Sequence, residues 1–574
     1  MYKKNISALS KTNPELVQKL NEIDLETIKP HFTAYSLKNG EIVLAYNSIP
    51  LDDIYAPIEN SKKIWNETVK SPLSKNDFVF VFGLGLGYLF KRAFVETNAR
   101  IIMYEPNIEI LRYVLEYTDL SDALEQERVL FTNSSDECSR VLRAKYITND
   151  KLEVVYNNQY LQAYHEELKR FTQCILDACQ NKLADIETGF RYRTAWVENI
   201  AKNIFAKDNY YALNFLKNKF EGKTALIAAA GPSLNKDIEL IKANRNKFVI
   251  IAVNKIYEYL VNSGIIPDFT VFADAEALLL TFPNGVPEFF DTNIIMSLRT
   301  DKFCTTFNTL NNFLIFNDDQ NISSLLHQKA PELVELTDFS GTTSGIAFYA
   351  AKILGFKKII FSGLDLAFKD EEYWATQEKP DISDDTVVIS EHNRKKITEI
   401  TSFKGTKIKS REDYAIYIKE LSEIFRAEKE IELFNLTDFG AKIDGMKYEQ
   451  LENILPTLSE FEFDRTLSQF LDKEIREKQT KLNHIMKEML LELINQALEL
   501  KDKVAAAQKP NSEILRLIAQ NALLYTLLEK DILYLLGLSK QVVNMSEFTE
   551  EFRKLCNKTV EKIEFIEQLK QNNN

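Results

Sequence analysis

The sequence predicts a multidomain α/β protein, with an N-terminal Rossmann-like α/β domain, a central α/β domain built on a parallel sheet, and a C-terminal α-helical domain. Three observations support this fold class. The chain of 574 residues exceeds the size of one ordinary hydrophobic core, so several domains are expected. Short apolar runs alternate with helical patterns in two separate regions. The last part of the chain has long amphipathic patterns and no strand-like run.

The first alternating region predicts an N-terminal α/β domain over residues 1–150. The stretch DFVFVFGLGLGYLFKRAF (77–94) has the pattern of a strand, a glycine turn and a helix. The stretch ARIIMYEPNIEILRYVL (99–115) has that of a strand, an acidic residue and a helix. Residues 151–220 carry helical periodicity, as in YLQAYHEELKRFTQCILDACQNKL, and we expect a helical connector there.

The second alternating region predicts a central α/β domain over residues 221–450. Its apolar runs of strand length are ALIAAA, FVIIAVN, FTVFAD, NIIMSL, NFLIFN, KIIFSGLD and IELFNL, and helical patterns such as SGIAFYAAKILG (344–355) separate several of them. Strands that alternate with helices form a parallel sheet covered on both faces. Residues 451–574 contain stretches such as FLDKEIREKQTKLNHIMKEMLLELINQALELKDKV, which predict packed antiparallel helices.

Composition and charge narrow the functional classes. A hydrophobic content of 45% with 27% charged residues is typical of a soluble globular protein. The net charge of −13 disfavours a general nucleic-acid binder, because neutralising phosphates takes clustered Lys and Arg. The five cysteines form no C-x-x-C pair, so the sequence supports neither a disulfide framework nor a zinc site. We find no signal-peptide pattern and no membrane-length apolar run, and we expect a cytoplasmic protein.

The first glycine loop, Gly83-Leu84-Gly85-Leu86-Gly87, allows two interpretations. A strand–glycine–helix turn can admit a nucleotide, and Glu105 at the end of the next strand stands where an acidic residue would hold ribose hydroxyls. The pattern resembles the opening of S-adenosylmethionine-dependent methyltransferases. Alternatively, the glycines only let a helix pack closely on a strand. We favour close packing, because no later methyltransferase motif follows.

The second glycine turn, Gly231-Pro232-Ser233, predicts a phosphate site. It follows the strand-like run ALIAAA, and the small residues allow a ligand to approach the backbone. We expect Pro232 in the first turn of a helix, and Ser233 places a hydroxyl beside the free N–H groups of that helix start. Such groups, with the positive end of the helix dipole, favour a phosphate. An ordinary capped turn is the alternative.

Polar residues follow several of the other predicted strands. Asn254 and Asp274 stand at the carboxyl ends of two strands, where the ligands of open α/β sheets bind. Thr342-Thr343-Ser344 precedes a helix rich in small residues, and the strand after that helix ends in Gly363-Leu364-Asp365. The carboxyl edge of the central sheet is therefore the predicted site.

These motifs resemble a known family. Residues from about 224 to 440 resemble the bacterial sialyltransferases that use CMP-sialic acid, which share a GPSL turn, an S-G-x-x-helix-LG-(F/Y) unit and a G-(I/L)-D strand end. The order and spacing of all three hold in this chain. Over most of its length the chain resembles the motility accessory factor (Maf) family of bacterial flagellin glycosyltransferases. There, a sialyltransferase-like centre lies between an α/β N-terminal domain and a helical C-terminal domain.

The resemblance implies roles for these residues. In the sialyltransferases the GPS turn contacts the CMP phosphate and ribose, the asparagine after the second strand contacts the nucleotide, and the serine that opens the S-G helix lies against cytidine or phosphate. The implied nucleotide-binding residues are Gly231, Pro232, Ser233, Asn254, Asp274, Thr343, Ser344 and Gly363. A tyrosine past the G-(I/L)-D motif binds the leaving phosphate. The implied catalytic residues are Ser344, Tyr373, Asp365 and His392.

This sequence departs from the sialyltransferase pattern at three points. Ala230 replaces the asparagine before the GPS turn, and Asp274 replaces the asparagine of the next strand, with a charge that favours ribose hydroxyls or a cation over a phosphate. The general-base histidine has no secure counterpart: His392 is the nearest histidine, but its alignment is not secure and its basic surroundings also fit a solvated surface residue, so the identity of the base stays open. The polar stretch 369–386 follows Asp365, and we expect it to form a lid rather than only an exposed acidic loop.

The function implied is transfer of a nonulosonic acid, of pseudaminic or legionaminic type, from its CMP-activated donor to Ser or Thr hydroxyls of flagellin, for flagellar assembly and motility. The resemblance implies no metal or other cofactor. The C-terminal helices would receive the acceptor or only pack on the catalytic domain. Two alternatives remain open. One is a pterin pyrophosphokinase-like enzyme that uses ATP and Mg²⁺ held by residues such as Asp274, and the other is a non-catalytic flagellin-binding assembly factor.

Overall fold

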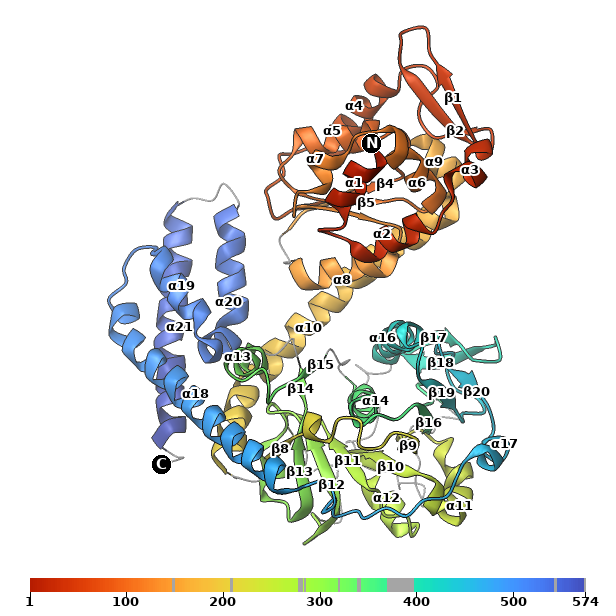
Figure 1. Cartoon of the computed structure of the whole chain (residues 1–574). Helices are drawn as coiled ribbons and strands as arrows, with labels where there is room; N and C mark the ends of the chain where they lie inside the picture. The colour runs from red at the N-terminus through yellow and green to blue at the C-terminus, as the bar shows by residue number, and fades with distance from the viewer. Residues whose placement is uncertain are drawn as a thin grey trace. The chain divides into compact units, whose positions relative to one another are not determined.

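The structure, a computed structural model, is shown in Figure 1. It describes residues 1–146, 150–206, 210–276, 282, 285–317, 321–337, 342–368, 397–540 and 545–571. The chain divides into two compact units. The first comprises Met1–Thr188 with Leu533–Phe548, and the second comprises Gly189–Ile532 with Thr549–Asn574.

The first unit is built on a four-stranded parallel sheet in the order β6-β5-β4-β7. Every residue of the central strand β4 is buried, as expected for a parallel strand covered on both faces. The predicted strand, turn, helix and strand over residues 77–115 are confirmed as β4, α5, β5 and α6. The strands are β4 (Phe78–Phe82), β5 (Arg100–Tyr104), β6 (Val129–Thr132) and β7 (Leu152–Tyr156).

Further elements complete this unit. A small antiparallel sheet contains β1 (Phe32–Ser36), β2 (Ile42–Tyr46) and β3 (Ile49–Pro50). The helices are α1 (Tyr2–Leu9), α2 (Pro14–Asn21), α3 (Leu25–Ile28), α4 (Pro57–Thr68), α5 (Tyr88–Glu96), α6 (Ile108–Tyr117), α7 (Ser121–Leu124), α8 (Ser135–Lys145) and α9 (Asn158–Ala163), with a 3₁₀ turn η1 (Lys29–His31).

The range expected to be a helical connector, 151–220, is largely helical. The helix α10 (His165–Ala206) is 42 residues long and continues through the boundary between the two units. The same range also contains strand β7, whose run LEVVY pairs with β4, and β8 (Tyr210–Ala212), which joins the sheet of the second unit. Both runs are short and apolar, and their pairing partners lie far away in sequence.

The second unit is built on a nine-stranded sheet in the order β20-β19-β16-β9-β10-β11-β12-β13-β8, and its strand pairs are parallel. The predicted alternation of strands and helices is thereby confirmed, and with it the α/β fold class. The strands not yet given are β9 (Thr224–Ala228), β10 (Val249–Val253), β11 (Phe269–Phe272), β12 (Phe290–Met296), β13 (Thr309–Leu314), β16 (Lys358–Ser362), β19 (Glu432–Asn435) and β20 (Lys447–Tyr448).

Helices cover both faces of this sheet. On one face, α14 (Thr343–Leu354) and α16 (Glu412–Ala427) share a core with Ala225 and Ile227 of β9. On the other face, α11 (Leu234–Ala243) shares a core with the alternating residues Leu226 and Ala228. Figure 1 shows α14 on the opposite side of the strands from α11 and α12 (Tyr257–Asn262). Because α14 leads into the parallel strand β16, it begins at the carboxyl edge of the sheet.

The strand order reverses between β9 and β16. From β9 the chain proceeds through β10 to β13 on one side, and it then returns to place β16 on the other side of β9. In open α/β sheets such a switch point opens a crevice at the carboxyl ends of the strands, where ligands bind.

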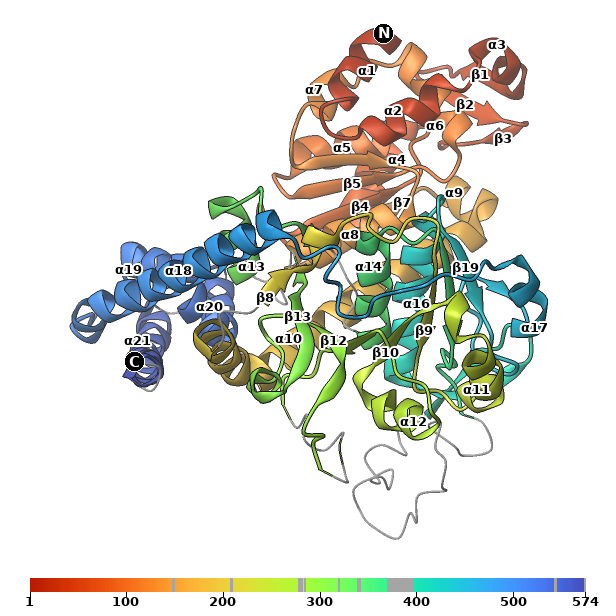
Figure 2. The same cartoon turned by 60° about the horizontal axis from the view of Figure 1, so that its bottom comes forward.

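Helices dominate the last part of the chain. Figures 1 and 2 both show α18 (Lys473–Ala505) beside α19 (Ser512–Gln520) and α21 (Met545–Gln571), as the predicted packed helices require. Among the residues described after β20, the structure has no strand. In the described part of the chain, no helix is long and apolar enough to cross a membrane. The other helices here are α17 (Leu451–Ile454), α20 (Ala522–Lys540) and η7 (Leu455–Thr457).

Smaller elements complete the second unit. Its remaining elements are η2 (Leu213–Leu216), η3 (Arg245–Lys247), η4 (Asn254–Ile256), η6 (Lys302–Thr306), β14 (Phe316–Asn317), α13 (Asn321–Lys329), β15 (Leu336–Thr337), β17 (Ile397–Thr401) and β18 (Lys407–Arg411). Strands β17 and β18 form an antiparallel hairpin, and β14 pairs with β15.

Candidate functional site at the carboxyl edge of the large sheet

The turn after β9 and the turn after β16 meet at the switch point. The backbone N–H of Gly231 donates to the carbonyl oxygen of Gly363 at 2.8 Å. A Cβ atom on Gly231 would lie 2.4 Å from that carbonyl and 2.4 Å from Oδ2 of Asp365. Gly363 has φ +80°, which favours glycine, and a Cβ there would lie 2.3 Å from the carbonyl of Ala229. Both glycines therefore allow two turns of this protein to approach each other.

The side chain of Asp365 forms hydrogen bonds with the Gly231-Pro232-Ser233 turn from inside the protein. Its Oδ2 accepts from the backbone N–H of Ser233 at 2.8 Å, and its Oδ1 accepts from the Ser233 hydroxyl at 2.5 Å. Both residues are buried, each 1% exposed. Burial raises the pKa of the Asp365 carboxyl, while hydrogen bonds from Ser233 and Thr437 oppose that rise. The carboxylate stands where the sequence alone predicts a ligand phosphate.

The other amides at this helix start are also paired. Helix α11 begins at Leu234, so Pro232 precedes the helix rather than lying in its first turn. The N–H of Leu234 donates to Gly231 O at 3.2 Å, and the N–H of Asn235 donates to Pro232 O at 3.2 Å. The expected free N–H donors at this turn are therefore used inside the protein.

Residues at and after the end of β19 hold Asp365 in place. The side-chain amide of Asn435 donates to Leu364 O at 3.0 Å, and the N–H of Ala441 donates to Asp365 O at 2.8 Å. Thr437, which is also buried, bonds to the Asp365 carboxyl and accepts from the N–H of Gly440. The role of these residues is not evident from the sequence, because only the parallel pairing of β16 with β19 brings them to the turn.

A second cluster follows β10 and β11. The side-chain amide of Asn254 donates to Oδ2 of Asp274 at 3.2 Å, so the structure brings together two of the residues predicted at the carboxyl edge. Asn254 is buried, whereas Asp274 is exposed. Beside them, burial lowers the pKa of Lys255 to about 8, with the charge of Asp274 opposing that change and the charge of Arg411 adding to it. The residue as a whole is exposed, although protein atoms around its ammonium group desolvate it.

The start of α14 differs from that of α11. Thr342 is its N-cap, and its hydroxyl accepts from the N–H of Gly345 at 2.9 Å. Thr343 and Ser344 form the first turn and are half-buried. Within the described residues, no hydrogen bond to the backbone N–H of Thr343 or Ser344 is found. Two hydroxyls, two amides and the positive end of the helix dipole therefore meet at this edge of the sheet.

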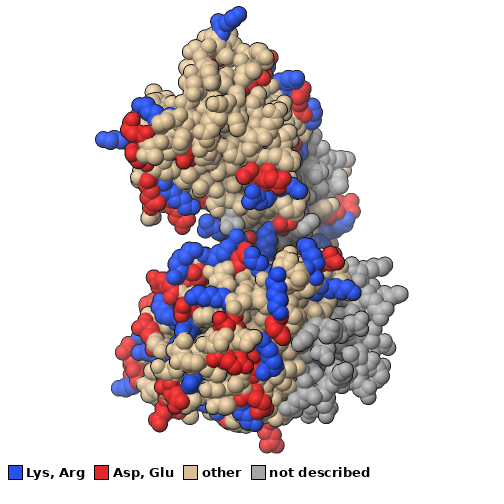
Figure 3. Space-filling view, turned by 90° about the vertical axis from the view of Figure 1, so that its right-hand side faces the viewer, with Lys and Arg blue, Asp and Glu red and all other residues tan. Residues whose placement is uncertain are grey.

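A basic hairpin lies next to this edge. The Ser410 hydroxyl of β18 donates to Leu366 O at 2.7 Å, and the N–H of Phe368 donates to Lys409 O at 3.1 Å. Arg411 pairs with Asp413, its Nε lying 2.8 Å from Oδ1. The exposed lysines of the hairpin are Lys404, Lys407 and Lys409. Figure 3 shows Lys and Arg side chains gathered on the face of the second unit that carries the hairpin.

The glycine loop of the first unit is filled by the protein itself. A Cβ atom on Gly83 would lie 2.3 Å from the Tyr160 ring, and one on Gly85 would lie 2.5 Å from the Asp52 carboxylate. Glu105 accepts from the N–H of Leu84 and from the Tyr160 hydroxyl, both at 2.7 Å. The acidic residue that would hold ribose hydroxyls is thus bonded inside the fold. The structure supports close packing over cofactor binding at this loop.

Comparisons with known proteins agree with this architecture. A solved MAf glycosyltransferase from Magnetospirillum magneticum AMB-1 aligns with a TM-score of 0.53 and 17% sequence identity, covering 100% of this chain and 96% of that chain. This chain shares its fold. The predicted resemblance to the Maf architecture is thereby confirmed at the level of fold.

The matches found by sequence cover shorter parts of the chain than the structural match does. The family model described as 6-hydroxymethylpterin diphosphokinase MptE-like matches residues 198–371, which contain the switch point. An uncharacterized protein of Treponema pallidum (strain Nichols) is 25% identical over 255 residues, 43% of this chain and 86% of its own length. A second uncharacterized protein of that organism is 26% identical over 168 residues, 28% of this chain and 76% of its own length.

The predicted site residues fall into three groups. Gly231, Ser233, Gly363 and Asp365 form one closed unit, whereas Asn254, Asp274, Thr343 and Ser344 lie at the accessible carboxyl edge. The expected lid and two of the candidate catalytic residues, Tyr373 and His392, lie outside the described residues. Sequence analysis did not identify Lys255 or the basic hairpin, although Lys255 directly follows Asn254 and would be found by reading past the strand end.

Proposed function

We propose that the second unit transfers a nonulosonic acid, of pseudaminic or legionaminic type, from its CMP-activated donor to Ser or Thr hydroxyls of flagellin. The observation that carries this proposal is the open start of α14, where Thr343 and Ser344 face the same sheet edge as Asn254 and Lys255. The fold shared with a MAf glycosyltransferase supports the reaction class.

The proposed donor contacts follow from the groups at this edge. The phosphate of CMP bonds to the N–H and hydroxyl groups of Thr343 and Ser344. The amide of Asn254 donates to and accepts from the cytidine or the ribose, and Asp274 accepts from ribose hydroxyls. Lys255 and the hairpin lysines offset the negative charges of the phosphate and of the sugar carboxylate. The closed Ser233–Asp365 unit keeps the strand ends in position.

In the transfer step, the bond between the anomeric carbon of the sugar and the phosphate oxygen breaks, and CMP leaves with the electron pair. The hydroxyl oxygen of the acceptor forms the new bond, and its proton goes to a general base. Charge grows on the departing phosphate, so the fixed donors of α14 and the Lys255 ammonium stabilise the transition state more than the ground state. Tyr373 and His392 remain our candidates for phosphate binding and for the base.

The direct test combines the full chain, a CMP-activated nonulosonic acid and monomeric flagellin, with the intact mass of flagellin as the readout. We expect one sugar mass or more to be added, with and without EDTA. Ser344→Ala and Asn254→Ala should abolish transfer while flagellin binding persists. The matched control is Ser512→Ala, which removes an exposed hydroxyl from the first residue of α19. Normal transfer by both site variants would contradict the assigned site.

A second candidate function is a pterin diphosphokinase-like reaction, favoured by the family model that matches residues 198–371. It requires ATP and Mg²⁺, and Asp274 is an exposed carboxylate at the sheet edge. Thermal unfolding with each nucleotide separates the candidates. Stabilisation by CMP without metal supports the transferase, whereas stabilisation only by ATP with Mg²⁺ supports the kinase. Flagellin binding with no nucleotide effect would indicate an assembly factor.

A further inference from the structure

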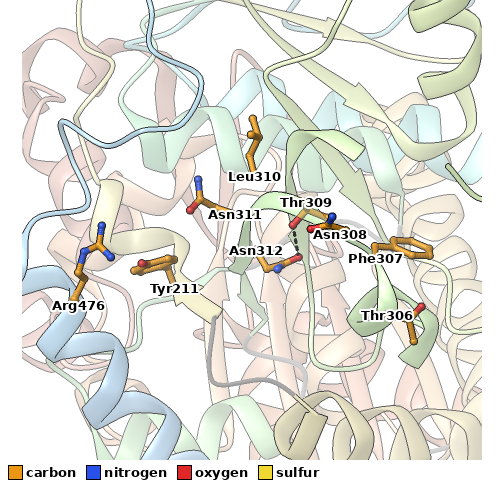
Figure 4. Close-up of a pocket in the computed structure, with 9 residues that line it drawn as sticks. All are labelled: Tyr211, Thr306, Phe307, Asn308, Thr309, Leu310, Asn311, Asn312 and Arg476. Carbon is orange, nitrogen blue, oxygen red and sulfur yellow. Dashed lines mark hydrogen bonds between the residues drawn. The ribbon is translucent and has the colours of Figure 1, made fainter. Parts of the chain in front are cut away.

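A cavity of about 430 Å³ opens at the amino end of β13. Because the strands of this sheet are parallel, it lies at the edge opposite the start of α14. Figure 4 shows Arg476 of α18 and Tyr211 of β8 on one side and the segment Thr306–Asn312 on the other. All of these residues belong to the second unit. The proposed transfer reaction does not use this cavity.

The cavity contains one cation that is ready to bind an anion. The Nε of Arg476 donates to Leu471 O at 3.0 Å, which fixes the plane of the guanidinium group. In the described part of the chain, its two Nη groups have neither a hydrogen bond nor an ion pair. None of the described lining residues is acidic. A guanidinium group in this state presents paired N–H donors that match the two oxygens of a carboxylate.

The rest of the lining is suited to hydroxyl groups. Asn311 is held by its NH₂ group, which donates to Asn293 Oδ1 at 2.8 Å and to Thr466 O at 3.0 Å. The Thr309 hydroxyl donates to Asn312 Oδ1 at 3.3 Å, and the NH₂ of Asn312 has no partner among the described residues. Amides that donate and accept complement sugar hydroxyls, which do the same.

An aromatic wall completes the cavity. Tyr211 is 8% exposed, and its ring packs against Phe313 with the centroids 5.8 Å apart, so it is held in place. A fixed ring offers an apolar face to the C–H groups of a sugar, while its hydroxyl can reach a polar group. Most ligand cavities of comparable size are lined mainly by apolar side chains. This one instead combines amides, hydroxyls and one guanidinium with the rings of Tyr211 and Phe307 and the side chain of Leu310.

We propose that this cavity binds an acidic monosaccharide, with the carboxylate on Arg476 and the hydroxyl groups on the side chains of Asn308, Asn311 and Asn312. A single cation with no acidic neighbour in the lining matches one negative charge, which favours a sugar acid over a nucleotide or a phosphorylated ligand. The protein would then hold saccharide at two edges of one sheet, and this second site is independent of the donor site.

The test measures binding of glucuronate and of glucose to the full chain by saturation-transfer NMR and calorimetry. The two sugars differ in the carboxylate, so glucuronate should bind at least tenfold more tightly. Arg476→Gln should reduce glucuronate binding to the level of glucose, and Asn308→Ala, a change at an exposed residue, should weaken both. The control Lys473→Gln removes a charge from the same helix at a side chain that is 91% exposed, and it should leave the binding of both sugars unchanged.

Several results would overturn the proposal. If acetate or inorganic phosphate bound as tightly as glucuronate, the cavity would be a simple anion site and not a site for a sugar acid. Equal binding of glucose and glucuronate, or no saturation by either, would also exclude a sugar-acid site. Glucuronate binding that survives Arg476→Gln but is lost in Ser344→Ala would belong to the other edge of the sheet. If Arg476→Gln unfolds, Tyr211→Phe, which removes only a hydroxyl, must weaken sugar binding for the proposal to stand.

Discussion

The glycine loop of the first unit and the start of α14 are similar as candidate ligand sites, yet they differ in what occupies them. At the loop, Tyr160, Asp52 and Glu105 use the space and the amides that a cofactor would use. At α14, the amides of Thr343 and Ser344 remain open among the described residues. A glycine in such a turn therefore indicates that another part of the protein approaches its backbone closely. Backbone N–H groups without a partner are the better indication of a ligand site.

The Gly231-Pro232-Ser233 turn lies between these two cases. It stands at the switch point, as a nucleotide site would, but Asp365 accepts from its amide and its hydroxyl. In two glycine turns of this protein, internal carboxylates thus accept hydrogen bonds from the backbone amides. We therefore expect the two closed turns to contribute to stability and the open helix start to contribute to binding.

The largest expected effect comes from adding a methyl group to the closed loop. In Gly83→Ala the new Cβ would overlap the Tyr160 ring, and φ +86° would add backbone strain, so we expect a loss of about 3 kcal/mol or more of unfolding free energy. The control Gly40→Ala has nearly the same φ, +85°, and no atom within 4 Å, so backbone strain alone should cost about 1–2 kcal/mol.

Unfolding of the first unit can be followed by the fluorescence of Trp65, which is buried there. Trp196→Phe and Trp374→Phe would remove the other tryptophans. Equal urea midpoints for Gly83→Ala and Gly40→Ala would mean that the loop has room for a ligand after all.

The next effect is a dependence of stability on pH in the same unit. Burial raises the pKa of Asp52 and of Glu105 to about 7. The folded unit therefore holds more protons than the unfolded chain between pH about 4 and 7, and its stability should fall as pH rises through that window. Each pKa unit corresponds to about 1.4 kcal/mol, so the loss should reach a few kcal/mol.

Asp52→Asn should reduce this dependence to the part that Glu105 contributes. Its partner Asn157 can turn its amide to match the new NH₂ group, so the variant should fold. Urea unfolding at pH 5, 6 and 7 with the Trp65 reporter measures the effect. A wild-type midpoint that rises with pH over this range would show that the two carboxyls are ionised and well satisfied in the folded unit.

Much of the fold is predictable from this sequence, because apolar runs of strand length and helical periodicity are local. The strands of both sheets in residues 77–115 and 224–435 follow such runs. Occupancy of the glycine turns is not predictable, because it depends on partners distant in sequence. Asp365 lies 132 positions from Ser233, and Tyr160 lies 55 positions from Glu105. Asn254 and Asp274 were found because residues at the carboxyl ends of parallel strands share one edge.

A third prediction separates the two helix starts. Ser344→Ala should weaken CMP binding about tenfold, equivalent to about 1.4 kcal/mol, without changing thermal stability, because no described residue forms a hydrogen bond with its hydroxyl. Ser233→Ala should do the reverse. It removes a donor from a buried carboxylate and should cost about 1–3 kcal/mol of unfolding free energy with little change in CMP affinity. Calorimetry measures the CMP affinity of both variants, and thermal unfolding measures their stability. If Ser233→Ala instead weakened CMP binding and Ser344→Ala lowered stability, the phosphate would bind at the GPS turn and not at α14.

The smallest effect should come from Lys255. Burial lowers its pKa to about 8, so the ammonium is charged at pH 7 and largely neutral at pH 9. CMP affinity should therefore fall severalfold, by less than about 1.4 kcal/mol, as pH rises from 7 to 9. Lys255→Gln should bind CMP at both pH values as weakly as the wild type does at pH 9, whereas Lys404→Gln, which removes an exposed charge at the tip of the hairpin, should keep the pH dependence. If both variants retain that dependence, the group that titrates is not Lys255, and the phosphate lies away from the strand end that carries it.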